Sequence, residues 1–201
     1  MDEEELIAAA HEGDLHSFNQ LVEIYQGMVY NLAYRILGDG EEAADATQEA
    51  FLSAFQAIGN FRGGSFKAWL MHIVTNACYD QLRHRKRRPA TSLEALLVDS
   101  ERSSTFSSDM KSPEEYVAQR ELNEFLQEGI NALQPHQRVT LILSDVQGLS
   151  YEEIAQVTQV SLGTVKSRLA RGRARLRDHL LKREELLPDE FRLKYSDSAD
   201  G

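Results

Sequence analysis

Cysteine and long apolar runs are scarce in this chain of 201 residues. Cys78 is the single cysteine, so no intramolecular disulfide can form and a Cys-rich zinc site is excluded. No apolar run approaches the roughly 18 residues that a membrane-spanning helix needs. The first residues are acidic and lack the basic segment and apolar stretch of a secretion signal. We therefore expect a cytoplasmic protein without membrane insertion.

Proline is scarce too, and the alternation typical of β-strands is absent. The chain has four prolines, and all of them fall where other signals begin or end a helix. Apolar residues recur at steps of three and four, which is the spacing of one helix face. Between the capping residue Asp14 and Gly38 this stripe comprises Leu15, Phe18, Leu21, Val22, Tyr25, Val29, Leu32, Ala33 and Ile36. The pattern predicts an all-α protein.

Capping residues, glycines and prolines divide the rest of the chain. We expect helices over residues 41–58, 66–88, 113–132, 135–147 and 151–158, and a last one from Ser161 to about residue 180. Residues 89–112 are rich in Ser and Thr, and this segment is too long for an ordinary connection within a domain. We therefore predict two small helical domains, 1–88 and 113–183, joined by a flexible linker over 89–112. A loose acidic tail should follow over 184–201.

The net charge of −10 is unusual for a protein that binds nucleic acid, but the charge is unevenly distributed. Residues 1–60 carry twelve acidic side chains and one basic one. Residues 61–88 carry seven basic and one acidic, and residues 161–183 carry eight basic and one acidic. Blocks this pure in sign favour two contacts with nucleic acid over two merely solvated helix faces.

The second basic block follows a short helix and a tight turn. Ser150 and Glu153 form a capping-box pattern before the short helix, and Ser161 can cap the basic helix after it. This order is typical of a helix-turn-helix, whose second helix reads base edges in the major groove while later arginines bind phosphates. The candidate DNA contacts are Thr164, Lys166, Ser167, Arg168, Arg171, Arg173 and Arg175, the last two nearest the phosphates. The alternative is an amphipathic helix that binds a protein or a membrane surface.

The first basic block begins with aromatic residues and glycines at a helix entrance. Aromatic rings beside positive charge suit single-stranded nucleic acid, where each stacked base contributes about 1–3 kcal/mol. Glycine also allows a backbone to approach a ligand closely. The alternative is that Phe61, Phe66 and Trp69 belong to the core at a helix corner. The candidate contacts are Phe61, Arg62, Gly63, Gly64, Ser65 and Trp69 and, further along the helix, Asn76, Asp80, Arg83 and Arg87.

Taken in order, these motifs resemble those of extracytoplasmic-function (ECF, group IV) sigma factors of the sigma-70 family. Residues 45–51 (DATQEAF), followed by Phe61-Arg62 and Trp69-Leu70, are similar to the σ2 domain. Residues 148–155 (GLSYEEIA) and 163–169 (GTVKSRL) are similar to the σ4 domain. The resemblance implies a protein that binds core RNA polymerase and directs it to specific promoters to start transcription.

The resemblance also implies partners for each surface. The helix with Asp45, Gln48, Glu49 and Phe51 would bind the β′ clamp helices of core RNA polymerase, and the second domain would contact the β flap. The 61–76 loop and helix would engage the unwound −10 element of promoter DNA, and the last basic helix would read the −35 element. Such proteins are commonly held inactive by an anti-sigma factor.

Two other classes of protein are alternatives. A free-standing helix-turn-helix regulator would explain the second basic block but has no need of the first. An enzyme would need a catalytic constellation, but the six histidines are scattered without metal-ligand spacing, and no glycine-rich phosphate loop follows a strand. We therefore expect no catalytic residue, no metal and no cofactor.

Overall fold

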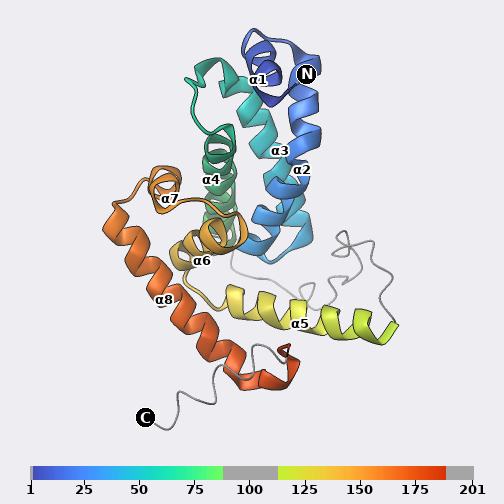
Figure 1. Cartoon of the computed structure of the whole chain (residues 1–201), viewed down its shortest axis with the longest axis vertical. Helices are drawn as coiled ribbons and strands as arrows, with labels where there is room; N and C mark the ends of the chain where they lie inside the picture. Colours follow the sequence, from blue (N-terminus) through green and yellow to red (C-terminus); the bar gives the residue numbers. More distant parts are fainter. Residues whose placement is uncertain (1, 88–112, 189–201) are drawn as a thin grey trace.

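The computed structural model describes residues 2–87 and 113–188, and within them the secondary structure is entirely helical. The first domain holds α1 (Glu3–His11), α2 (Leu15–Leu37), α3 (Gly40–Ala57), the short 3₁₀ helix η1 (Ile58–Asn60) and α4 (Phe66–Arg87). The second holds α5 (Pro113–Asn131), α6 (Pro135–Leu141), η3 (Ile142–Val146), α7 (Tyr151–Thr158), α8 (Leu162–Leu180) and η4 (Leu181–Leu186). The predicted all-α fold with two helical domains is confirmed (Figure 1). Residue 88, the expected linker 89–112 and the tail from 189 onward lie outside the described residues.

Helix α1 is an element that the periodicity did not predict. Its N-terminus is a complete capping box, because the Glu5 backbone N–H donates to Asp2 Oδ1 at 2.9 Å and the Asp2 N–H donates to Glu5 Oε2 at 3.1 Å. Its apolar side, Leu6 with Ala10, is buried, and the Tyr25 hydroxyl on α2 donates to Glu3 at 2.7 Å. The acidic start of the chain is therefore part of the first domain.

Alanines let α3 lie close to α2 and α4 in the first domain. The side chains that α3 buries completely are Ala43, Ala46, Ala50 and Ala54, all 0% exposed. Steps of three and four place them on one face. Opposite them, α2 contributes the predicted apolar stripe apart from its first member, Leu15, which is 56% exposed. The helix begins after Asp14, whose carboxylate accepts from the Ser17 N–H at 3.0 Å. Gly38 ends α2 in the left-handed conformation, with φ of 73°.

The second domain contains the predicted helix-turn-helix. Ser150 and Glu153 form a capping box before α7, Gln159 turns the chain with φ of 53°, and the Ser161 hydroxyl accepts from the Thr164 N–H at 3.2 Å before α8. The single α-helix expected over 135–147 is corrected. The α-helix ends at Leu141, and the chain continues as one π-helical turn, η3. A π turn inserts a residue into the helix, here where the chain carries Ile142 and Leu143 into the core.

The chain beyond α8 turns back onto the start of the second domain. Arg183 donates to Glu121 on α5 at 2.5 Å, and its guanidinium lies over the Phe125 ring at 5.4 Å. Leu187, in the segment expected to be loose, is 8% exposed. These contacts join η4 to α5.

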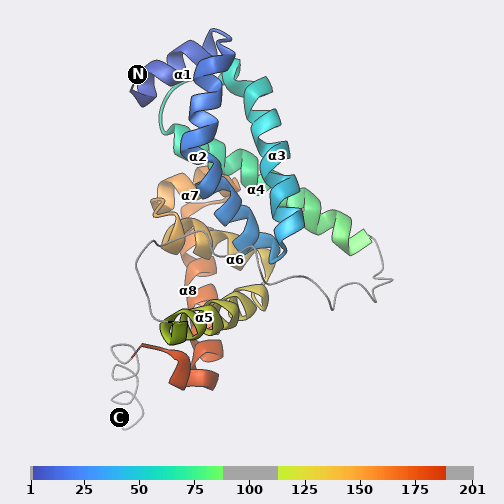
Figure 2. The same cartoon turned by 90° about the vertical axis from the view of Figure 1, so that its right-hand side faces the viewer.

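The two domains pack against each other. Helix α4 contacts α7, and the end of α2 contacts α5, α6 and η3. Figures 1 and 2 show the same arrangement from two sides, with α7 beside α4 and α5 crossing below α2. Segments that lie about one hundred residues apart in sequence therefore meet at a single interface, as Arg138 and Ile36 do.

Candidate nucleic-acid interface

Helix α8 presents a basic face to solvent and an apolar face to the domain core. Val165, Leu169 and Gly172 are buried, whereas Lys166 and Arg171 are exposed. Arg171 is braced along its own helix, since its Nε donates to the Ser167 carbonyl at 3.1 Å. The predicted contacts Thr164 and Ser167 are partly buried on the same helix, and the Ser167 hydroxyl donates to the Thr164 carbonyl at 3.0 Å.

Arg173 and Arg175, expected nearest the phosphates, have partners within the protein. Arg173 donates from Nε to Asp145 Oδ2 at 2.9 Å and from Nη2 to Oδ1 at 2.5 Å, which is a bidentate ion pair. The hydrogen bond from Arg173 holds the pKa of Asp145 below its usual value, and the same pair raises the pKa of Arg173. Arg175 donates to the Gln137 side chain at 3.3 Å. Arg173 therefore joins α8 to η3 in the free protein.

His136, on the first turn of α6, faces the arginines of α8. Its pKa is lowered, first by desolvation and then by the positive charges of Arg168, Arg171 and Arg175. Three arginines of α8 therefore lie near His136, on one side of the second domain. An electropositive surface of this kind attracts the phosphates of nucleic acid.

Aromatic residues support the loop before α4. The ring centroids of Phe61 and Trp69 are 5.4 Å apart, those of Phe66 and Trp69 are 5.3 Å apart, and Phe66 also contacts Tyr25 at 5.5 Å. Phe66 is buried, whereas Phe61 and Trp69 are half-buried at the surface of this cluster. Phe66 therefore belongs to the core, whereas Phe61 and Trp69 pack on the core and keep part of their surface accessible.

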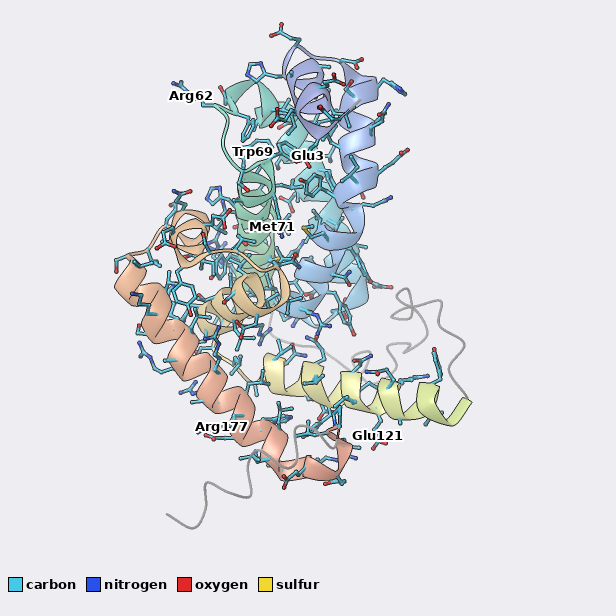
Figure 3. The ribbon with its side chains drawn as sticks, in the orientation of Figure 1. Glu3, Arg62, Trp69, Met71, Glu121 and Arg177 are labelled. Atoms are coloured by element: carbon cyan, nitrogen blue, oxygen red, sulfur yellow. The ribbon has the colours of Figure 1, made fainter. Side chains whose placement is uncertain are left out.

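The loop itself is held by two glycines and one cap. Gly63 and Gly64 have φ of 88° and 90°, a region that favours glycine. The Ser65 hydroxyl accepts from the Ala68 N–H at 3.1 Å and so caps α4, as expected. Arg62 is exposed, and Figure 3 shows its side chain projecting outward from the loop.

Further along α4, the predicted polar contacts differ in their exposure and in whether they pair with another side chain. Asn76 is exposed and lies 3.2 Å from the His72 ring nitrogen. Asp80 pairs with Arg83 one turn on. Arg87 is exposed at the end of the helix. The Asp80–Arg83 pair neutralises part of the positive charge that the sequence placed here.

One face of α3 carries exposed acidic and apolar residues together. Asp45, Gln48 and Glu49 are exposed, and Leu52 continues the same face with 57% of its surface accessible. The predicted contact Phe51 is instead half-buried against the core. Leu52 was not among the predicted contacts, and its spacing from Gln48 and Glu49 places it on the same exposed face.

The described residues can also be searched for a metal site and for a membrane-spanning helix. In the two described ranges, no group of three or more His, Cys, Asp or Glu side chains is placed to hold a metal ion. Likewise, none of the helices described is both long and apolar enough to cross a bilayer.

Sequence comparisons match both domains to known families. The model of Sigma-70 region 2 matches residues 21–88, and that of Sigma-70 region 4 matches residues 126–176. The ECF RNA polymerase sigma factor SigE of Mycolicibacterium smegmatis is 38% identical over 87% of this chain, which spans 66% of that protein. The RNA polymerase sigma-H factor of Pseudomonas aeruginosa is 37% identical over 85% of this chain and 90% of its own length.

Similar structures have been solved as complexes. The sigma factor RpoE of Bartonella quintana, in complex with the anti-sigma factor NepR, matches with a TM-score of 0.64 and 26% identity, over 83% of this chain and 98% of that chain. CnrH, in complex with the cytosolic domain of CnrY, matches with a TM-score of 0.61 and 25% identity, over 87% of this chain and 94% of CnrH. With both regions of the sigma-70 family matched and two basic surfaces on separate helical domains, the chain belongs to the ECF sigma factors, which direct RNA polymerase to promoters.

Proposed function

We propose that each of the three surfaces described above has one role in promoter recognition. The observation that carries the proposal is the separation of charge: two basic surfaces lie on different domains, and an exposed acidic face lies on α3. The acidic face is proposed to bind polymerase, and the two basic surfaces are proposed to bind DNA. In this proposal the chain has no chemistry of its own and works in the cytoplasm, where polymerase and DNA are.

The α3 face is proposed to bind the β′ clamp helices of core polymerase. Asp45 and Glu49 supply negative charge to a basic partner, and Leu52 supplies apolar area beside them. Burying a leucine side chain fully stabilises a contact by about 1.5–3 kcal/mol, so Leu52 contributes as much as a good charge pair. The second domain is proposed to contact the β flap.

The loop and the first half of α4 are proposed to hold the unwound −10 element. Half-buried rings such as Phe61 and Trp69 are pre-oriented, so a base can stack on them without ordering a flexible side chain. Arg62 lies where it can pair with a phosphate beside such a base. Asn76 offers both a donor and an acceptor to a base edge.

The N-terminal half of α8 is proposed to read the −35 element. Lys166 is exposed and Arg168 partly so, near the capped end of the helix that enters a major groove in helix-turn-helix proteins. Arg171 is proposed as the main phosphate contact, because Arg173 is already paired with Asp145.

A second protein is proposed to hold this sigma factor inactive. Support comes from the two similar structures, one with an anti-sigma factor and one with the cytosolic domain of a partner protein. A protein captured from cell extract on the purified chain should inhibit transcription that depends on the chain. A captured protein that leaves this transcription unchanged would argue against an anti-sigma role.

Run-off transcription tests the proposed function. Core polymerase of the same organism should give discrete transcripts from fragmented genomic DNA only when this chain is added, and sequencing of their 5′ ends should reveal shared upstream elements. Permanganate should detect unpaired thymines near the start sites. Tight, sequence-specific binding by the isolated chain, with no melting when polymerase is added, would instead identify a free-standing regulator.

A further inference from the structure

A hydrogen bond within α4 joins His72 to Asn76, the residue proposed above to contact a base edge of the −10 element. The two residues are one helical turn apart and therefore share a face of the helix. The Asn76 amide nitrogen lies 3.2 Å from His72 Nε2. Because Asn76 is exposed and His72 is half-buried, the imidazole supports the amide from the inner side.

The atoms in contact determine which group donates. An amide nitrogen can only donate a hydrogen bond, so Nε2 of His72 accepts. The Gln159 amide nitrogen lies 3.3 Å from the same Nε2 and also requires an acceptor there. Nε2 accepts only when the ring is neutral and carries its proton on Nδ1. Burial lowers the pKa of His72 below its ordinary value, which favours the neutral ring at neutral pH.

The groups around His72 do not supply it with a carboxylate. Arg62 is the charged side chain that lines the same pocket, and α7 contributes the neutral Gln156 to the wall of that pocket. Glu153, also on α7, interacts with Lys67 at the start of α4. Among the described residues, none of the ion pairs includes His72. The ring is therefore not held in its protonated form by an anion.

The direction of this hydrogen bond determines what Asn76 offers to DNA. When His72 accepts, one amide N–H is used, and the carbonyl oxygen and the other N–H remain for a base. This pair suits a base with an amino group, as adenine has at N6 beside N7 and cytosine has at N4. When the side chain at position 72 donates, the amide turns over and only its N–H groups remain. These suit guanine and thymine, whose O6, N7 and O4 are acceptors.

We propose that His72 is a positioning residue that sets the orientation of the Asn76 amide, and thereby the base preferred at one position of the −10 element. The inference rests on the −10 contact proposed for Asn76. Both residues belong to α4, so their hydrogen bond needs no contribution from another element. Protonation converts the ring from an acceptor to a donor, so the preferred base should also depend on pH.

Two substitutions with fixed hydrogen-bonding roles test the inference. His72→Glu, when ionised, can only accept, whereas His72→Lys can only donate. Holoenzyme is assembled from core polymerase and the full chain, and its binding is measured on fragments of a promoter identified by run-off transcription, with each base in turn at every −10 position. Asn76→Ala identifies the position where Asn76 acts, because the base preference there should be lost.

At that position, the wild type and His72→Glu should prefer adenine or cytosine about tenfold over guanine or thymine. His72→Lys should shift the preference toward guanine or thymine by a similar factor. Each comparison is between bases for one protein, so the effect of the new charge on overall affinity cancels. A histidine with a merely structural role would change the affinity for all bases alike. Equal base preferences of His72→Glu and His72→Lys would overturn the inference.

The pH profile of the wild type tests the same inference without a substitution. As the pH falls from about 8 to about 5, the wild-type preference should shift toward that of His72→Lys, whereas His72→Lys itself should not change, because lysine stays protonated throughout. A wild-type preference that stays constant over this range would contradict the role of the ring. If Asn76→Ala changes no base preference although transcription starts normally, the contact proposed for Asn76 fails, and the inference fails with it. A wild-type chain that starts no transcripts with core polymerase would instead refute the sigma function on which both rest.

Discussion

Charge reversal on α3 should weaken the binding of core polymerase and leave the stability of the fold nearly unchanged. The change is Asp45→Lys with Glu49→Lys, at two exposed positions opposite the alanines that pack on α2. Neither lies in the first turn, where helix-dipole effects are concentrated, and both charges change sign together, so their mutual repulsion persists. The free energy of unfolding should therefore change by no more than about 0.5 kcal/mol, as for ordinary surface substitutions.

Binding to core polymerase should respond much more strongly. If each carboxylate meets a cation in a desolvated contact, losing one pair costs about 2–5 kcal/mol. Even the low end for a single pair, about 2 kcal/mol, weakens binding roughly thirtyfold. Competition against labelled wild-type protein for core polymerase measures this loss, with thermal unfolding as the check on the fold.

A matched control has the same change in net charge. Glu4→Lys with Glu12→Lys also replaces two exposed carboxylates, but on or just after α1 rather than on α3. It should compete nearly as well as the wild type, apart from a small effect of long-range charge. Equal competition by the α3 double variant and the wild type would refute the assignment of this face to polymerase.

Three further outcomes follow from the second domain. Arg168→Ala should weaken promoter binding by about 1–3 kcal/mol and relax the base preference at one upstream promoter position, whereas Arg175→Ala should weaken binding to all promoters alike. Binding assays on promoter variants measure both effects, and equal weakening of every variant by the two substitutions would contradict this division. Arg173→Ala should lower the midpoint of thermal unfolding, because Asp145 loses its bidentate partner; an unchanged midpoint with weaker DNA binding would mean that Arg173 serves DNA instead. Because the pKa of His136 is lowered in the folded protein, the unfolded chain binds a proton at this group first as the pH falls. The free energy of unfolding should therefore be unaffected by this group above about pH 6.5 and decrease below it. Denaturant titrations of the wild type and His136→Gln at several pH values measure this difference.

Local signals in the sequence were sufficient for most helices and for the family. The caps at Asp14, Ser150 and Ser161 lie within three residues of the N–H groups they accept from, so they can be read without knowing the fold. Helix α1 carried the same kind of signal in Asp2 and Glu5, but its apolar residues form one short run over 6–10, which shows no repeat at steps of three and four. The π turn after Leu141 has no comparable local signal.

Which side chains are free to bind a partner required the tertiary structure. Arg173 looks like a phosphate contact in the sequence, but its partner Asp145 lies 28 residues earlier, on another element. Phe51 and Leu52 are both apolar residues of α3, and packing against the core turned the first inward and left the second exposed. Contacts between distant segments depend on how the helices pack, which spacing along one helix does not determine.

The sequence by itself determined the helices, the two basic blocks and the helix-turn-helix, because capping, periodicity and charge depend on neighbours within one or two turns. Only the tertiary structure decided that α4, which carries most of the first block, packs against α7 of the helix-turn-helix. Arg138 reaches the carbonyl of Ile36 across 102 positions of sequence. An arginine that caps a helix of another domain leaves no local trace, because its partner is a main-chain carbonyl that every residue possesses.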